Sequence, residues 1–253
     1  MLVDYHIHGM GHRDFPHSVE SLARFVEAAL GKGIAEVGFA DHDYYLRDIR
    51  FSNFEELRTR FPGIGIKVGL EVEFFPGQET ETNDRLAGCR FDYLIGSVHY
   101  IGEWLFDHPD YIEGFSAWDI DQLYRVYFGL VARMARTRLF DMVGHLDLIK
   151  IFGHRAKSPV LKMVQPTLEE IRDSGMVIEV NTAGLHRPVQ EQYPAKDLLK
   201  AAFQMGIPIT LSSDAHAPEQ VGRDLLLARE MAREVGYREA ATFSGRERIM
   251  VPL

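Results

Sequence analysis

A run of apolar residues that ends in a histidine or a carboxylate recurs along this chain, and this pattern restricts the folds that it can adopt. The first run, Val3-Asp4-Tyr5-His6-Ile7-His8, carries two histidines two positions apart. Alternate side chains of a β-strand lie on one face, so both imidazoles can reach one cation if the strand end opens into a cavity. Five later runs end in the same way, at Asp41-His42, Glu71, His99, His145 and Asp214-Ala215-His216.

Segments with helical periodicity separate the strand-like runs. In residues 18–32 the apolar positions follow helical spacing, and Gly33 is a suitable end. Ser116-Ala117-Trp118-Asp119 resembles a capping box and opens a helix that we expect to reach about residue 138. We expect the other helices at 53–61, at 158–175 with a kink or a split at Pro166, at 194–205 and at 218–235. We expect strands at 3–8, 34–40, 64–75, 91–99, 141–148, 176–181 and 207–212, and an edge strand or hairpin after them.

This alternation predicts an α/β fold with parallel strands and crossover helices. Length and strand count suit a β/α barrel of one domain, residues 1–253, whose reactive side chains lie at the carboxyl ends of the strands. An open doubly wound sheet is the main structural rival, but it would gather ligands from only a few strands at one crevice. Nearly every strand here contributes a candidate ligand, which favours the closed barrel.

Composition excludes several classes of protein. The net charge is −9 and no basic run is present, so the chain lacks the footprint of a nucleic-acid-binding protein. The single cysteine, Cys89, excludes an intramolecular disulfide and a cysteine-rich zinc site. No stretch approaches the ~18 apolar residues of a membrane span, and the first strand pattern starts without the basic and apolar regions typical of a signal peptide. We therefore expect a soluble cytoplasmic protein, with its oligomeric state open.

The polar residues at the strand ends predict a metal centre. Six of the eleven histidines, with Glu71 and Asp214, fall at or just past these ends. A single histidine there would more often be a hydrogen-bonded loop residue, but independent placement would scatter them. Imidazole and carboxylate ligands without thiolate suit zinc, manganese or iron. About nine candidate ligands are more than one ion needs, so we expect two or three metal ions. Ions ~3.5–4 Å apart would hold a hydroxide between them for phosphoryl transfer.

These motifs, in this order and spacing, resemble the PHP (polymerase and histidinol phosphatase) superfamily. The resemblance rests on Asp4-Tyr5-His6-Ile7-His8, Asp41-His42, Gly69-Leu70-Glu71-Val72-Glu73-Phe74, Gly96-Ser97-Val98-His99-Tyr100, Gly144-His145-Leu146-Asp147 and Ser213-Asp214-Ala215-His216. A narrower resemblance to the PHP-type histidinol-phosphatases rests on Phe152-Gly153-His154-Arg155, Asn181-Thr182-Ala183-Gly184-Leu185-His186-Arg187-Pro188 and Tyr193-Pro194-Ala195. It implies a distorted (β/α)7 barrel, a trinuclear metal site and hydrolysis of L-histidinol phosphate in histidine biosynthesis.

The resemblance also implies a ligand set for each ion. The first ion would take His6, His8, Glu71 and Asp214, and the second would share a bridging Glu71 with His99 and His145. The third would take His42, His216 and one residue of the loop after the first strand. That loop offers His12, Asp14 and His17. Counting forward from His8 favours Asp14, whereas counting back from Gly33 favours His17, which we predict.

The same resemblance suggests how the site would work. A hydroxide between the first two ions would attack phosphorus in line, while the third ion, Arg155 and Arg187 bind phosphoryl oxygens, since a guanidinium fork suits a phosphate. Asp214 or His216 could assist the leaving alkoxide. His154 and Tyr100 complete the predicted substrate-binding set.

Neighbouring residues are expected to support this site. Asp41 could orient His42, and Asp147 could orient His145 or point to solvent. In the long loop after the fourth strand, we expect Tyr100, Trp104, Phe106 and Asp107 to enclose the imidazole and cationic amine of the substrate.

Other activities fit the sequence less well. A PHP phosphodiesterase or nuclease would need a basic groove, and an amidohydrolase commonly needs a strand-end lysine that this chain lacks. A non-catalytic metal-binding module would have lost ligands, whereas this chain keeps them.

Overall fold

Seven strands form the central sheet of the computed structural model, which describes residues 1–253. Every neighbouring pair is parallel. Because the strands run the same way, their carboxyl ends meet at one side of the sheet. In spatial order the strands are β1 (Val3–Ile7), β2 (Glu36–Phe39), β3 (Gly65–Glu73), β4 (Tyr93–Ser97), β7 (Met142–Val143), β8 (Val177–Asn181) and β9 (Ile209–Ser212).

The sheet closes on itself just beyond the ends of β1 and β9. Ile7 and Ala215 form a parallel bridge, in which the His8 amide donates to the Ala215 carbonyl at 2.8 Å. The Ala215 amide donates in return to the His6 carbonyl at 3.2 Å. The prediction of a (β/α)7 barrel is therefore confirmed, and the open doubly wound sheet is wrong.

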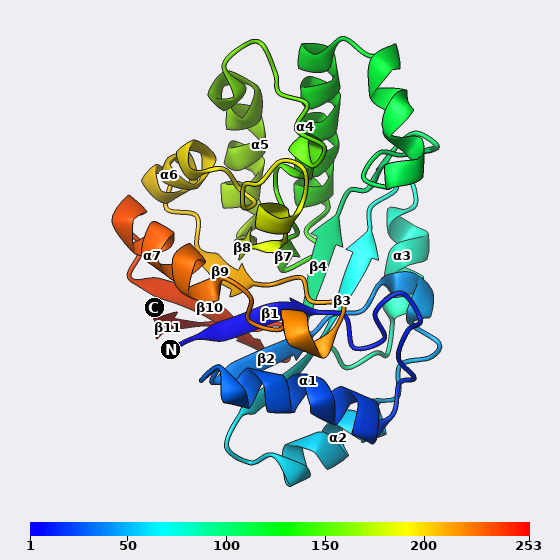
Figure 1. The fold of residues 1–253 in the computed structure, drawn as a ribbon. Coiled ribbons are helices and arrows are strands. Elements are labelled where there is room, and N and C mark those ends of the chain that lie inside the picture. The colour runs from blue at the N-terminus through cyan, green and yellow to red at the C-terminus, as the bar shows by residue number, and fades with distance from the viewer.

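Seven α-helices surround the sheet (Figure 1). The Ser18 hydroxyl accepts a hydrogen bond from the Ser21 amide and so caps the first helix. Pro166 lies within a continuous helix and does not split it, and an additional helix that we did not predict spans Glu79–Leu86. The helices are α1 (Val19–Gly31), α2 (Phe51–Arg60), α3 (Glu79–Leu86), α4 (Ile120–Thr137), α5 (Val160–Ser174), α6 (Lys196–Gln204) and α7 (Leu225–Val235).

Several predicted boundaries were wrong. The helix expected to open at Ser116 begins at Ile120, because the Asp119 side chain accepts from the Gln122 amide and caps it there. The strand expected at 141–148 is only Met142–Val143, because the backbone turns at His145, where φ is +22°. The loop 100–115 contains a short hairpin, β5 (Tyr100–Ile101) and β6 (Trp104–Leu105), and 3-10 turns over Pro109–Ala117. The last helix starts only at Leu225, after a 3-10 turn.

A C-terminal hairpin covers the amino end of the barrel. Its strands, β10 (Glu239–Ser244) and β11 (Glu247–Pro252), are antiparallel, as the sequence predicted. The Phe243 ring packs on Tyr5 and Tyr93, and the Phe243 amide donates to the Tyr5 hydroxyl at 2.8 Å. A Cβ at Gly69 would lie 2.3 Å from the Tyr93 ring, so only glycine leaves room for this aromatic plug. The hairpin does not cover the opposite end of the barrel, where the carboxyl ends of the strands lie.

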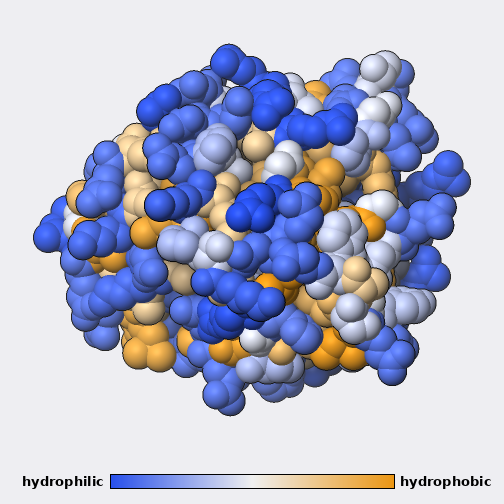
Figure 2. Space-filling model, turned by 90° about the horizontal axis from the view of Figure 1, so that it is seen from above, coloured by the Kyte–Doolittle hydropathy of each residue, from blue (hydrophilic) through white to orange (hydrophobic).

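The outer surface is mainly polar. Figure 2 shows a face on which hydrophilic side chains predominate, with apolar atoms scattered among them. None of the helices combines the length and the apolar character that crossing a membrane requires.

Candidate metal centre

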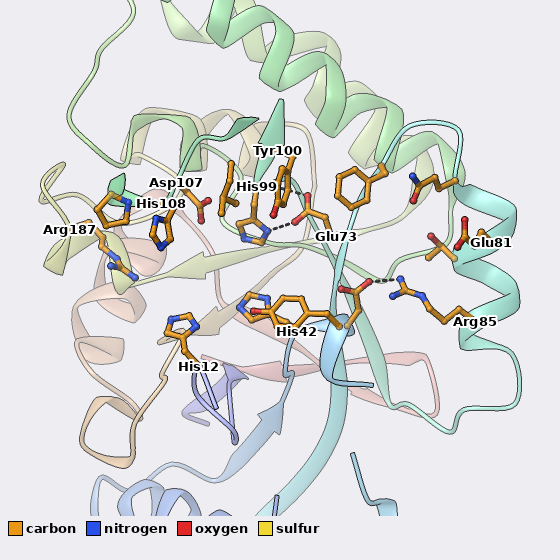
Figure 3. Close-up of a pocket in the computed structure, with 17 residues that line it drawn as sticks. His12, His42, Glu73, Glu81, Arg85, His99, Tyr100, Asp107, His108 and Arg187 are labelled. Atoms are coloured by element: carbon orange, nitrogen blue, oxygen red, sulfur yellow. Dashed lines mark hydrogen bonds and ion pairs between the residues drawn. The ribbon is translucent and has the colours of Figure 1, made fainter. Parts of the chain in front are cut away.

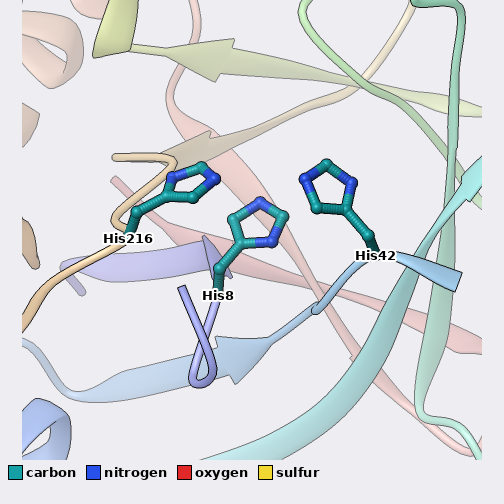
Figure 4. A group of neighbouring side chains, drawn as sticks. All are labelled: His8, His42 and His216. Carbon is teal, nitrogen blue, oxygen red and sulfur yellow. The ribbon is translucent and has the colours of Figure 1, made fainter. Parts of the chain in front are cut away.

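Three overlapping groups of metal-ligating atoms gather at the carboxyl end of the barrel. Within each group the candidate atoms lie within 4.8 Å of one another. The groups are His6, His8 and Glu71; Glu71, His99 and His145; and His8, His42 and His216. Figure 4 shows the third, with the His8 ring between the other two.

His6 and His8 meet as their spacing predicts, although β1 is irregular. Its register with β2 shifts between Asp4 and Ile7, yet the two Nε2 atoms lie 3.1 Å apart. Two imidazole nitrogens 2.0–2.1 Å from a tetrahedral zinc ion would lie roughly 3.3 Å apart, so the donor geometry fits a shared cation. Asp214 Oδ1 lies 3.3 Å from His8 Nε2 and belongs to the same cluster.

Glu71 lies between the donor groups. Its Oε1 is 3.0 Å from His145 Nε2 and 3.4 Å from His99 Nε2, and these two nitrogens are 3.2 Å apart. Its Oε2 faces the other side, 3.4 Å from His6 Nε2 and 2.9 Å from His42 Nδ1. A carboxylate whose two oxygens face separate imidazole sets has the arrangement of a bridging ligand.

His12, but not His17, lies next to the third group. The His12 ring centroid is 4.4 Å from that of His216 and 6.3 Å from that of His42. His17, immediately before the cap of α1, instead packs against Phe54 of α2 and belongs to none of the groups. The structure therefore does not support the predicted ligand His17, because its side chain turns toward α2.

Two carboxylates that sequence reasoning did not assign orient the ligands. Glu179 Oε2 lies 3.0 Å from His6 Nδ1, and Glu179 Oε1 accepts from the His145 amide at 2.5 Å. Glu73 Oε2 lies 2.6 Å from His99 Nδ1. The two ring contacts occupy Nδ1 of His6 and of His99 and leave Nε2 of each ring for a metal, an arrangement common at metal sites. Both glutamates lie in predicted strands. Because burying an unpaired charge is costly, a glutamate in a buried strand could have been expected to pair with a histidine or a cation.

The predicted partners of His42 and His145 are wrong. Asp41 Oδ1 accepts from the Met10 amide at 2.9 Å and so holds the loop after β1 rather than the His42 ring. Asp147 is buried and lies 2.7 Å from the Lys150 ammonium, so it neither orients His145 nor points to solvent.

Opposing effects act on the central carboxylate. Burial would raise the pKa of Glu71, but positive charge on His6, His42 and His99 outweighs burial and holds the pKa well below its usual value. Glu71 is therefore ionised at the point where cations would be bridged.

Two of the neighbouring imidazoles favour the neutral form. Burial, together with His216 and His42, holds the pKa of His8 well below its usual value. Burial also lowers the pKa of His216 to about 4, against the attraction of Asp214. Neutral imidazole is the form that binds metal, so both side chains are already in the ligating state near neutral pH.

Two of the candidate ligands are among the seven non-glycine residues with positive φ. His145 has φ +22° and Asp214 has φ +54°, values that non-glycine residues seldom adopt. Hydrogen bonds hold both: the His145 amide donates to Glu179, and the Asn181 amide group donates to Asp214 Oδ2 at 3.2 Å. Such strain is typical of functional sites whose surroundings enforce the geometry.

A cavity of about 710 Å³ opens from this cluster toward α3. Figure 3 shows Arg187 and His12 on one side of the cavity and Glu81 and Arg85 on the other. Its lining includes two arginines, four histidines and four carboxylates, those of Asp43, Glu73, Glu81 and Asp107. Asp43 pairs with Arg85 and Glu73 with His99, which leaves Glu81 and Asp107 without an ion pair. Tyr100 also lines it. A smaller adjoining space, which we call the floor, is lined by candidate ligands that include Glu71 and His145, and Asp107 lines both spaces.

Other predicted substrate contacts lie away from the centre. Arg155 forms an ion pair with Glu191 at 2.6 Å, and His154 stacks on Phe115 with ring centroids 4.4 Å apart. Both line a separate surface cavity with residues of the 112–120 segment. Trp104 Nε1 donates to the Tyr111 carbonyl within the loop, and Phe106 is buried against Tyr127 of α4, so neither aromatic lines the large cavity.

The barrel and its histidine-carboxylate centre define the class of protein. The PHP domain model matches residues 4–183, most of the chain, and the chain belongs to this family.

Similar proteins within this family share one name. The chain is 37% identical to the Deinococcus radiodurans protein named "Probable histidinol-phosphatase", over 93% of this chain and 94% of that one. It is 28% identical to the histidinol-phosphatase of Lactococcus lactis, over 96% and 94%. A Lactococcus lactis histidinol phosphate phosphatase, crystallised with zinc, L-histidinol and phosphate, superposes with a TM-score of 0.81 at 26% identity, covering 98% of each chain.

Proposed function

We propose that this chain is a metal-dependent phosphomonoesterase that hydrolyses L-histidinol phosphate to L-histidinol and phosphate. The observation that carries this proposal is the placement of Glu71, with each carboxylate oxygen facing a separate imidazole set at the floor of the cavity. The histidinol-phosphatase relatives, which align over nearly the whole chain, support the substrate. The single cysteine, Cys89, is free, which suits a reducing cytoplasmic location.

Up to three metal ions would occupy this centre. We infer one position at His6, His8, Glu71 and Asp214, a second at Glu71, His99 and His145, and a third at His42, His216 and His12. The imidazole and carboxylate donors suit zinc, manganese or iron. When bound, such ions lower the pKa of a water nucleophile and neutralise phosphoryl charge.

Arg187 and His216 are assigned different roles at this centre. Arg187 lines both the cavity and its floor, where a guanidinium fork can bind phosphoryl oxygens. His216 Nδ1 faces the Asp214 carbonyl at 3.1 Å, so Nε2 is the atom left for a metal. This arrangement favours a ligand role for His216.

The leaving group is a cation, and two carboxylates of the large cavity, Glu81 and Asp107, lack an ion pair. Asp107 Oδ1 is buried without a hydrogen-bond partner at the junction of cavity and floor. We infer that Asp107 pairs with the substrate ammonium, while Tyr100 lies against the imidazole.

A substrate panel tests the function. With metal-loaded protein, we expect kcat/KM for L-histidinol phosphate to exceed that for glycerol phosphate by about 100-fold or more, since losing a buried ion pair commonly costs this much. A chelator should abolish activity, and zinc, manganese or iron should restore it. Equal turnover of glycerol phosphate, or preference for a phosphodiester or an amide, would contradict the proposal.

Replacing His12 and His17 separately tests the third metal position. We expect His12→Ala to lose up to one bound metal per chain and to lower kcat/KM about 10- to 100-fold, the usual range for disturbed metal sites. His17→Ala, a matched change in the same loop, should leave metal content and kcat/KM unchanged. Metal analysis with steady-state kinetics measures both. Metal loss in His17→Ala but not in His12→Ala would restore the original assignment.

A further inference from the structure

A second cavity, of about 430 Å³, adjoins the metal centre on the side of β8 and β9. The ligands Asp214 and His216 line it together with His12. Two arginines, Arg187 and Arg223, line it as well. Arg187 is shared with the large cavity and the floor, so it lies where the three spaces meet.

Neither arginine is neutralised by a protein carboxylate. No ion pair within 4.0 Å involves Arg187 or Arg223, and Arg223 Nε is buried without a hydrogen-bond partner. Arg155 differs, because Glu191 occupies its guanidinium. Burial lowers the pKa of Arg223, the charges of Asp224 and Asp214 oppose this effect, and the positive charge of Arg187 adds to it. The lining also includes Asp14 and Asp214, but neither forms an ion pair with these arginines. Two guanidinium groups without an ion-pair partner beside the candidate metal ligands are therefore placed to bind an anion.

The backbone of Arg223 is fixed to the barrel rim. The Thr182 hydroxyl, at the end of β8, donates to the Arg223 carbonyl at 2.7 Å. The preceding amide, of Gly222, donates to Asp4 in β1 at 2.8 Å. Gly222 has φ +68°, and a Cβ there would lie 2.5 Å from Ile34, so the turn requires glycine. Anchors on two strands thus preorganise the position from which the side chain reaches the cavity.

We propose that Arg223, rather than Arg155, is the second arginine that binds the phosphoryl group, opposite Arg187. This inference rests on the proposed phosphomonoesterase function and deepens it. The arginine-lined cavity takes the dianionic end of the substrate and the released phosphate, whereas the large cavity takes the cationic alcohol. The two ends of the substrate are therefore sorted by charge across the metal centre.

Binding of inorganic phosphate to metal-loaded protein tests this assignment without turnover. We expect Arg223→Ala to raise the Kd of phosphate, measured by calorimetry, about 10- to 100-fold, the factor expected for losing hydrogen bonds to a charged group. Arg223→Lys should recover only part of the affinity, because an ammonium lacks the bidentate fork. The inhibition constant of L-histidinol, which carries no phosphate, should not change in either variant.

Two matched variants complete the experiment. Arg229→Ala removes an arginine of α7, the helix that follows Arg223, that does not line the cavity, and Arg155→Ala tests the original assignment. Both should bind phosphate as the wild type does, and metal analysis should show equal loading throughout. Unchanged phosphate affinity in Arg223→Ala, or weakened affinity in Arg155→Ala alone, would overturn the proposal.

The outcome also separates this inference from the proposed function. Wild-type protein that fails to hydrolyse L-histidinol phosphate, yet binds phosphate in an Arg223-dependent way, would refute the substrate and support the arginine assignment. Hydrolysis of L-histidinol phosphate, with a phosphate affinity that does not depend on Arg223, would support the substrate and refute the arginine assignment.

Discussion

Replacing Glu71 with alanine is expected to lower kcat for L-histidinol phosphate by at least about 10³-fold, more than the 10–100-fold typical of losing a residue that only supports a ligand. Glu71 is the one carboxylate whose oxygens face both imidazole sets, at 3.0 Å from His145 and 2.9 Å from His42. Without it, the histidines lose the negative charge that favours cations between them. We expect metal content to fall in parallel, measured by elemental analysis.

Two further variants make the Glu71 experiment specific. Glu71→Gln keeps the shape and removes the charge, so we expect it to resemble the alanine variant in kcat. Glu169→Gln makes the same chemical change on the exposed side of α5 and should leave kcat and metal content unaltered. Full metal loading with wild-type kcat in Glu71→Gln would refute the bridging role.

Replacing Lys150 with methionine is expected to lower the free energy of unfolding by about 3–5 kcal/mol. The Lys150 ammonium is 2% exposed and lies 2.7 Å from Asp147 and 3.0 Å from Glu191, and it donates to the Gln192 carbonyl. Its loss would leave the Asp147 carboxylate buried without a counterion. Urea denaturation, followed by circular dichroism, measures the change.

A double variant of Lys150 and Asp147 and a surface control test the cause of this destabilisation. Because Asp147→Asn removes the stranded charge, the double variant with Lys150→Met should be more stable than Lys150→Met alone. Lys196→Met breaks an exposed ion pair with Glu234 and should cost less than about 1 kcal/mol. Equal costs for Lys150→Met and Lys196→Met would show that burial of the charge is not responsible.

Much of the fold and the inner metal centre could be predicted because both depend on local patterns. Apolar runs ending in His6, His99 or His145 mark strand ends, and parallel strands bring such ends to one side of a barrel whatever the loops do. Crossover helices followed from helical periodicity in the same way. The errors in the fold fall where a tertiary turn shortens a regular element, as at His145.

Residues on loops were harder to assign, since their direction depends on partners far along the chain. His17 turns toward Phe54, and Arg155 turns toward Glu191, although each lies close in sequence to the site. Glu179 was missed because its partner, His6, is 173 residues away. No spacing within a single segment contains that information.

The order and chemical type of the strand-end residues were thus sufficient to determine a barrel with an imidazole-carboxylate centre. Only the tertiary structure decided which loop histidine and which arginines face that centre, and which buried glutamates orient its ligands. The physical reason is that strand direction and pleat position a side chain through its own backbone. A loop side chain takes its direction from the packing and charges of distant neighbours.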